Sequence, residues 1–215
     1  MRARQVLPVL GLAAAATLFL AFASPAQKPG EKPADTSGAA RAAGAYEVDG
    51  VHSSVLFRAK HFGVSYFYGA FSKVSGSFTV DAAKPENSKV TVEIDTDSVD
   101  SRNSGRDGHL KSPSFLDVKQ FPSATFVSKS VKKKGERTFT VAGDFTLHGV
   151  TKPVTLEMEE VGAAKTPKGA RAGFHGILTI QRSEYGITFM ADALSDEVQI
   201  TISLEGVQAG SGEGK

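Results

Sequence analysis

The stretch Val90-Thr91-Val92-Glu93-Ile94-Asp95 decides the fold class of this 215-residue chain. Apolar and polar side chains alternate at every position, which is the two-residue period of a β-strand with one buried face and one wet face. The same period recurs at 154–159 and at 198–205. Five further stretches are rich in Phe, Val and Thr and are bounded by turn residues: 52–62, 65–80, 123–132, 137–148 and 172–181. The sequence therefore predicts eight strands.

Short connections at 62–64, 133–136 and 148–150 join successive strands. Connections of this length join antiparallel neighbours. Eight half-buried antiparallel strands leave exposed edges unless the sheet closes, and closure removes those edges. We therefore predict an all-β fold, an eight-stranded antiparallel up-and-down barrel. A two-layer β-sandwich is the alternative that the same pattern allows.

One connection, residues 98–122, breaks the alternation and predicts one or two short helices. Asp100 or Ser101 is suited to be the helix N-cap, because an oxygen-bearing side chain accepts a hydrogen bond from the first helical turn. Gly105 and Gly108 make the helical pattern imperfect.

The N-terminal 23 residues have the pattern of a secretory signal. Two arginines precede an apolar run, and Ala21-Phe22-Ala23 predicts cleavage after Ala23. An uncleaved membrane anchor is the alternative reading. Residues 24–45 contain no Val, Ile, Leu, Met or aromatic residue and predict a disordered linker. The domain is then expected at 46–208, with a flexible tail at 209–215, in the periplasm or outside the cell.

Composition excludes several classes of function. The 40% hydrophobic and 22% charged residues are those of a folded globular protein, and without Arg2 and Arg4 the chain has 23 residues of each charge. A neutral chain has no strong attraction to nucleic acid. The absence of cysteine excludes disulfides and thiolate metal sites. No hydrolase, nucleotide or zincin motif occurs and the five histidines are dispersed, so we expect no enzyme, metal or cofactor.

The phenylalanines raise the question of what fills the barrel. An eight-stranded barrel is either filled by its side chains or holds one small ligand. Most phenylalanines fall within the predicted strands, where flat rings suit a plain core as well as an apolar cavity. Periodicity alone favours a plain core.

Arg106 and His109 form the densest polar group, within the 98–122 connection. On a helix they share a face with Leu110. They could bind a ligand head group at the mouth of the barrel, or they could tie the connection to the barrel rim.

The chain also resembles the YceI-like family of bacterial periplasmic proteins. The matching segments, in the family's order, are DGVHSSVLF at 49–57, KHFGV at 60–64, a central run from 97 to 126 that includes RDGHLKS at 106–112, GDFTLHGVTKPV at 143–154, and RSEYGI at 182–187. Tyr46 stands where the family often has tryptophan, and His148 where other polar residues also occur. The resemblance spans about 46–206.

This resemblance implies a lipocalin-like barrel, often dimeric, whose elongated interior binds a polyisoprenoid or similar amphiphilic lipid. It shifts the choice between core and cavity towards a cavity. The side chains implied as ligand-binding are six phenylalanines and, at one end, two polar groups: Phe57, Phe62, Phe71, Phe78, Phe115, Phe126, Arg106 and His109.

We therefore expect a secreted or periplasmic carrier with loose selectivity among isoprenoid quinones, undecaprenyl-type carriers and fatty-acyl compounds, loaded through transient contact with a membrane. One rival is an enzyme that acts on a lipid head group, with His109 as acid or base and Arg106 as the anion partner. Another is an envelope stress protein without a ligand.

Overall fold

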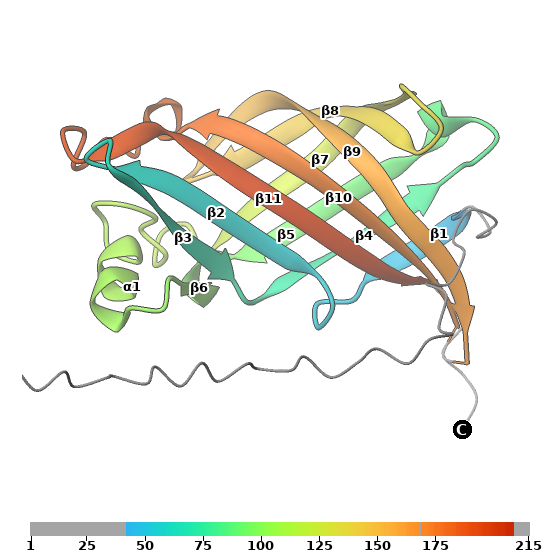
Figure 1. Cartoon of the computed structure of the whole chain (residues 1–215), viewed down its shortest axis with the longest axis horizontal. Coiled ribbons are helices and arrows are strands. Elements are labelled where there is room, and N and C mark those ends of the chain that lie inside the picture. The colour runs from blue at the N-terminus through green and yellow to red at the C-terminus, as the bar shows by residue number, and fades with distance from the viewer. Residues whose placement is uncertain (1–41, 168, 209–215) are drawn as a thin grey trace, which may run out of the picture. The chain divides into compact units, whose positions relative to one another are not determined.

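The alternating stretches form the strands of a closed antiparallel sheet in the computed structural model, which describes residues 42–167 and 169–208 (Figure 1). Its strands are β1 Gly44–Val48, β2 Ser54–His61, β3 Ser65–Phe71, β4 Val74–Val80, β5 Lys89–Asp95, β6 Val99–Asp100, β7 Ser123–Lys133, β8 Thr138–Leu147, β9 Val150–Thr166, β10 Gly169–Gln181 and β11 Leu194–Gln208. Short helical elements lie between them: η2 Pro85–Asn87, η3 Thr96–Ser98, α1 Ser104–Leu110 and η4 Arg182–Tyr185.

The sheet closes on β11. One edge of β11 pairs with β10, and the other pairs with β2 over its first half and with β1 at its end, where Tyr46 lies opposite Gln208. β1 and β2 are thus two halves of one bent strand, and so are β3 and β4, which pair with β2 and β1 respectively. β6 continues β5 in the same way by pairing with β3. When each of these bent strands is counted once, eight antiparallel strands follow one another in chain order around a closed sheet. This confirms the predicted barrel and excludes the β-sandwich.

Gly76 allows the sheet to bend within β4. Its φ is +136°, and a Cβ there would overlap the carbonyl oxygen of Thr91 on the paired strand β5. Only glycine adopts this backbone conformation without strain. The chain therefore places a residue without a side chain where the backbone of β5 leaves no room for one.

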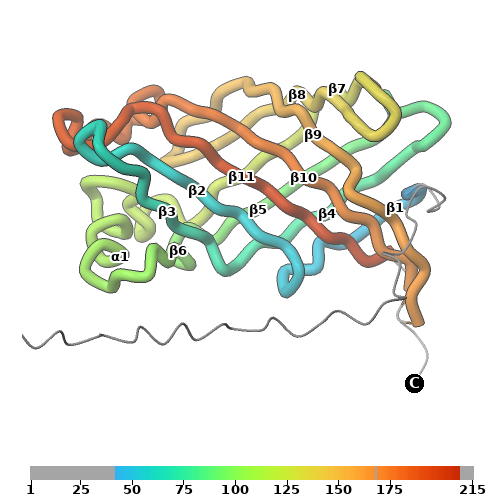
Figure 2. The backbone as a smooth tube through the Cα atoms, viewed as in Figure 1, coloured from blue at the N-terminus to red at the C-terminus, as the bar shows by residue number. Residues whose placement is uncertain are grey.

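The barrel has two distinct ends (Figure 2). The α1 end carries α1, the β2–β3 turn and the loop between η4 and β11. The β1 end carries β1 and the β7–β8 and β9–β10 turns. β10 and β11 cross the wall obliquely from one end to the other.

The 98–122 connection contains one α-helix, α1, whose N-cap is Asn103. The Asn103 side chain accepts a hydrogen bond from the backbone N–H of Arg106 at 2.9 Å. The expectation of Asp100 or Ser101 as the N-cap was wrong. Asp100 instead accepts from the backbone of Arg102, and the Ser101 hydroxyl binds Asp107.

The predicted linker ends earlier than its composition indicates. Gly44 and Ala45 are the first residues of β1 and lie opposite Val80 and Thr79 of β4, while the side chain of Ala42 is buried. Main-chain pairing with β4 orders this segment, and alanine and glycine carry no hydrophobic signal for such pairing. The predicted signal, residues 1–23, and the tail, 209–215, lie outside the described residues. Within the described part, no helix combines the length and hydropathy needed to cross a membrane.

Candidate ligand cavities inside the barrel

The interior of the barrel contains three apolar cavities in series. The α1-end cavity has a volume of about 100 Å³, the middle cavity about 50 Å³ and the β1-end cavity about 70 Å³. Each cavity shares wall side chains with the next. The α1-end and middle cavities share Val55, Ile94, Phe145 and Ile200. The middle and β1-end cavities share Val90, Val141, Met158 and Leu204.

These shared side chains decide what the interior can hold. One long chain can occupy all three cavities only if the side chains between them change rotamer. Met158 is well suited to do so, because methionine is unbranched and adapts to irregular gaps. The interior is thus a line of neighbouring apolar spaces that share wall side chains.

Glycines on neighbouring strands make part of this space. The Phe57 ring lies directly over Gly69 of β3, and a Cβ at Gly69 would overlap that ring. Phe78 and Phe126 lie in the same way over Gly206 and Gly143. Because these glycines have no side chain, the rings pack against the barrel wall and do not project across the lumen.

Five of the six predicted phenylalanines line a cavity. Phe57, Phe71 and Phe115 line the α1-end cavity, Phe126 the middle one and Phe78 the β1-end one. They come from four strands and from the connection between α1 and β7, and the closed sheet brings them to one interior. Their contact with a ligand stays a prediction.

Phe62 lies outside, and its prediction as a lining residue was wrong. It follows β2 in the turn to β3, with a φ of +48° and 63% of its surface exposed. The strand alternation that places Phe57 and Ala59 inside ends before the turn, so it cannot place Phe62. Its ring contacts only its neighbour His61 among the described aromatic pairs, at 4.5 Å between centroids.

Arg106 and His109 lie at the α1-end rim and contact protein groups. The Arg106 side chain donates to the Ser101 hydroxyl at 2.7 Å and to the Ser101 carbonyl at 2.6 Å, and it lies 5.1 Å from the centroid of the Phe67 ring. His109 packs edge to face against Phe115 at 4.9 Å. These contacts support the reading in which the pair ties α1 to the barrel.

Arg182 of η4 was missed as a site residue. It is buried, it lines the α1-end cavity, and its guanidinium donates to four backbone carbonyls. The acceptors are Ile187 and Phe189 at 2.8 Å, Ser195 at 3.0 Å and Leu194 at 3.3 Å. Burial lowers the pKa of its guanidinium. Only its place in the RSEYGI segment could have identified Arg182 as a site residue. A sequence does not show which backbone carbonyls will surround a side chain.

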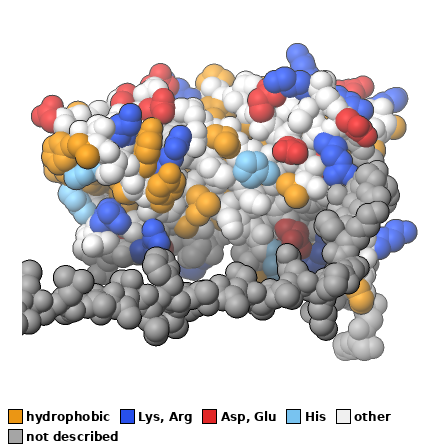
Figure 3. Space-filling view, viewed as in Figure 1, with side chains coloured by type: hydrophobic (Ala, Val, Ile, Leu, Met, Phe, Trp, Pro, Cys, Tyr) orange, Lys and Arg blue, Asp and Glu red, His pale blue; other side chains and the backbone are white. Residues whose placement is uncertain are grey.

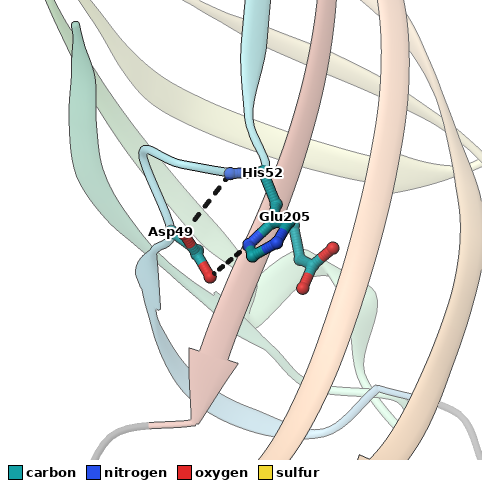
Figure 4. Close-up of side chains that lie close together, drawn as sticks. All are labelled: Asp49, His52 and Glu205. Atoms are coloured by element: carbon teal, nitrogen blue, oxygen red, sulfur yellow. Dashed lines mark hydrogen bonds and ion pairs between the residues drawn. The ribbon is translucent and has the colours of Figure 1, made fainter.

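A cluster of charged side chains links the β1–β2 turn to β10 and β11. His52 Nδ1 lies 2.8 Å from Asp49 Oδ2, with Glu205 of β11 beside them (Figure 4). Potential metal-ligand atoms of these three residues lie within 4.8 Å of one another. However, Arg171 of β10 donates to Asp49 at 2.8 Å and also to Glu205. Because the Arg171 guanidinium bridges both carboxylates, we assign the cluster to pairing β10 and β11 with the β1–β2 turn.

Asp49→Asn is expected to lower the free energy of unfolding by about 1–3 kcal/mol at neutral pH, since it weakens charge-assisted hydrogen bonds. Arg171 and His52 hold the pKa of Asp49 well below its usual range. The carboxylate therefore stabilises the fold above the unfolded pKa of about 3.9, and this contribution is lost as the pH falls further. Denaturant unfolding at several pH values checks this, with Asp192→Asn at an exposed position as control. A difference from the native chain that does not change with pH would contradict the assignment.

A closed eight-stranded barrel with apolar cavities along its axis defines a lipocalin-like protein. The chain belongs to the YceI-like family, because the model of the YceI-like domain matches residues 46–206. Protein YceI of Salmonella arizonae is 46% identical over 176 residues, which cover 80% of this chain and 91% of that protein. A UPF0312 protein of Yersinia enterocolitica is also 46% identical, over 81% of this chain and 91% of its own length.

Solved structures share this barrel. BcnA of Burkholderia cenocepacia has a TM-score of 0.66 and 28% identity, over 74% of this chain and 98% of its own. A polyisoprenoid binding domain from Saccharophagus degradans has a TM-score of 0.61 over 76% of this chain and 98% of its own. At 16% identity, this structural likeness shows the fold alone.

Proposed function

We propose that this protein is a carrier that holds a long-chain isoprenoid or a similar amphiphilic lipid inside its barrel, in the periplasm or outside the cell. The observation that supports this most is the line of three apolar cavities along the barrel axis. A chain-like ligand fits such an interior better than a compact one, because only a thin, flexible molecule can pass from one cavity to the next. The polyisoprenoid binding described for the domain from Saccharophagus degradans, which has the same fold, is consistent with this proposal.

Burial of an apolar chain supplies enough free energy. Each buried carbon contributes roughly 0.8 kcal/mol before the costs of ordering. About ten to fifteen buried carbons therefore supply roughly 8–12 kcal/mol, and the upper end of this range leaves a dissociation constant in the micromolar range after the costs of ordering. No head-group chemistry is needed, so we expect loose selectivity among lipids of similar thickness.

The polar groups near the α1-end cavity support carriage over catalysis. An enzyme acting on a head group would need Arg106 to bind an anion and His109 to move a proton. Arg106 instead donates to Ser101, and the His109 ring packs against Phe115 and Phe189. Both residues therefore have roles in holding α1 at the rim.

The test is purification of the protein from its own cells under native conditions, followed by organic extraction and mass spectrometry. We expect about one long-chain lipid per protein molecule, with chains of more than one type. Protein that carries no lipid and takes up no added polyprenol would contradict the proposal. Because the signal is predicted to be cleaved, a separate intact-mass spectrum of the purified protein gives the N-terminus of the exported chain, expected at residue 24.

A further inference from the structure

The α1 end of the barrel presents an apolar tip to solvent. Phe62 and Val64, in the β2–β3 turn, are 63% and 86% exposed, and Phe189 and Met190, in the loop before β11, are 46% and 38% exposed. The backbone N–H of Phe62 donates to the carbonyl of Ala193 at 2.7 Å, which holds the two segments together. We call these four exposed side chains the apolar tip.

Behind the tip, the outer face of the β2–β3 hairpin carries a band of aromatic and basic side chains. Lys60 lies opposite Tyr66, and Arg58 lies opposite Tyr68. The Arg58 guanidinium is 4.4 Å and the Lys60 ammonium 5.4 Å from the centroid of the Tyr66 ring. These four side chains form the basic aromatic band. Hydrophobic and basic side chains alternate over β2 and β3 in Figure 3.

The charge of this part of the chain has one sign. Within the β2–β3 hairpin, residues 54–71, the sequence contains two basic residues, Arg58 and Lys60, and no acidic residue. Elsewhere in the domain the two signs are mixed. The hairpin therefore favours contact with a negatively charged surface.

The tip adjoins the α1-end cavity. Phe189 packs edge to face against Phe115 at 5.6 Å between centroids, and Phe115 lines that cavity. Phe67, which lies on the same hairpin between Tyr66 and Tyr68, also lines it. A surface that covers the tip would thus lie next to one end of the cavity series.

We infer that the α1 end docks on a lipid bilayer that contains anionic lipid, with the apolar tip among the acyl chains and the basic aromatic band among the head groups. The order of side chains matches the depth profile of a bilayer. Phenylalanine, valine and methionine suit the hydrocarbon, whereas tyrosine, lysine and arginine suit the interface, where their polar ends stay hydrated. The inference rests on the proposed function, because the reason for docking is that a carried apolar lipid must leave one membrane and enter another.

The test measures binding to large unilamellar vesicles by flotation. The protein is taken from the periplasm of expressing cells, with its N-terminus determined by mass spectrometry. Vesicles of phosphatidylcholine and phosphatidylglycerol in equal amounts are compared with vesicles of phosphatidylcholine alone. We expect binding to the mixed vesicles to be stronger and to weaken at high salt, because the band interacts with anionic head groups.

Two variants separate the contributions. Phe62→Asn with Val64→Ser is expected to weaken binding to both vesicle types by about 30-fold or more, since two inserted apolar side chains are lost. Asparagine at 62 tolerates the positive φ of that position. Arg58→Glu with Lys60→Glu is expected to weaken binding only to the mixed vesicles, by about 25-fold or more. The matched control for the tip is Val51→Ser with Val161→Ser, because these two valines are 87% and 58% exposed. The matched control for the band is Lys132→Glu with Lys133→Glu. They are expected to bind as the native chain does.

Lipid extraction from the same samples distinguishes the two proposals. Protein that carries lipid but does not bind vesicles overturns the docking surface and leaves the carrier function in place. Protein that binds vesicles through the tip but never carries lipid overturns the carrier function and leaves the docking surface. Equal vesicle binding by the tip variant and its control overturns the inference. A native dimer that the tip variant converts to a monomer also overturns it, because the tip would then be covered by a second copy of the chain.

Discussion

Ala124→Phe is expected to weaken lipid binding by about 100-fold or more. Ala124 is buried on β7 and lines the α1-end cavity, whose volume of about 100 Å³ is comparable with that of a phenyl side chain. A ring placed there fills the space at one end of the series and excludes three or four carbons of the ligand. At roughly 0.8 kcal/mol for each carbon, the loss is about 3 kcal/mol, which is about 100-fold in the dissociation constant. Titration with a fluorescent polyene lipid measures it, together with the lipid content after native purification.

The control for this variant is Ala164→Phe, which adds the same ring at an exposed position of β9. We expect it to bind lipid as the native chain does. Overpacking at Ala124 costs about 1–3 kcal/mol of stability, so thermal unfolding must show that the variant is folded. Ala59→Phe on β2 fills the same cavity from another strand and provides a second variant. Undiminished lipid content in both folded variants would contradict occupation of the α1-end cavity.

Arg182→Ala is expected to lower the free energy of unfolding by about 3–5 kcal/mol. The variant leaves four backbone carbonyls at the α1 end without their donor, and each buried unpaired carbonyl carries a desolvation cost. In a protein of this size the loss corresponds to a melting temperature roughly 10 °C lower. The loop from 186 to 195 is held by these bonds, so we also expect faster proteolytic cleavage within it.

Arg182→Lys tests the geometric part of this argument. A lysine keeps the charge, but its single ammonium group cannot reach four carbonyls in the way that a planar guanidinium does. We expect it to recover less than half of the lost stability. Arg102→Ala, at an exposed arginine, is the control and should change the melting temperature little. A destabilisation of less than about 1 kcal/mol in Arg182→Ala would show that water replaces the guanidinium.

The sequence predicted much of the barrel because its signals are local. The alternation at 90–95, 154–159 and 198–205 places each residue on the inner or outer face, whichever strands become neighbours. β1 was not predicted, because Gly44 and Ala45 have no hydrophobic signal and are ordered by pairing with β4. The N-cap at Asn103 was missed for a similar reason: three oxygen-bearing residues precede α1, and contacts of Asp100 and Ser101 with their surroundings decide among them.

The candidate site was predictable only where strand alternation reaches it. Phe57, Phe71, Phe78 and Phe126 lie within strands, so their inward direction follows from the period of two. Phe62 lies in a turn, where that period gives no direction, and the prediction was wrong. The roles of Arg182 and of the apolar tip depend on the loop before β11, which carries no periodic pattern.

By itself, the sequence determined most of the strands, the class of fold and the family. Only the tertiary structure decided that the barrel interior has space in it and that the α1 end carries an exposed apolar tip. The physical reason is that both features depend on residues far apart in the chain. Phe57 meets Gly69, Phe78 meets Gly206, and Phe62 meets Ala193 only after the strands have paired and the sheet has closed.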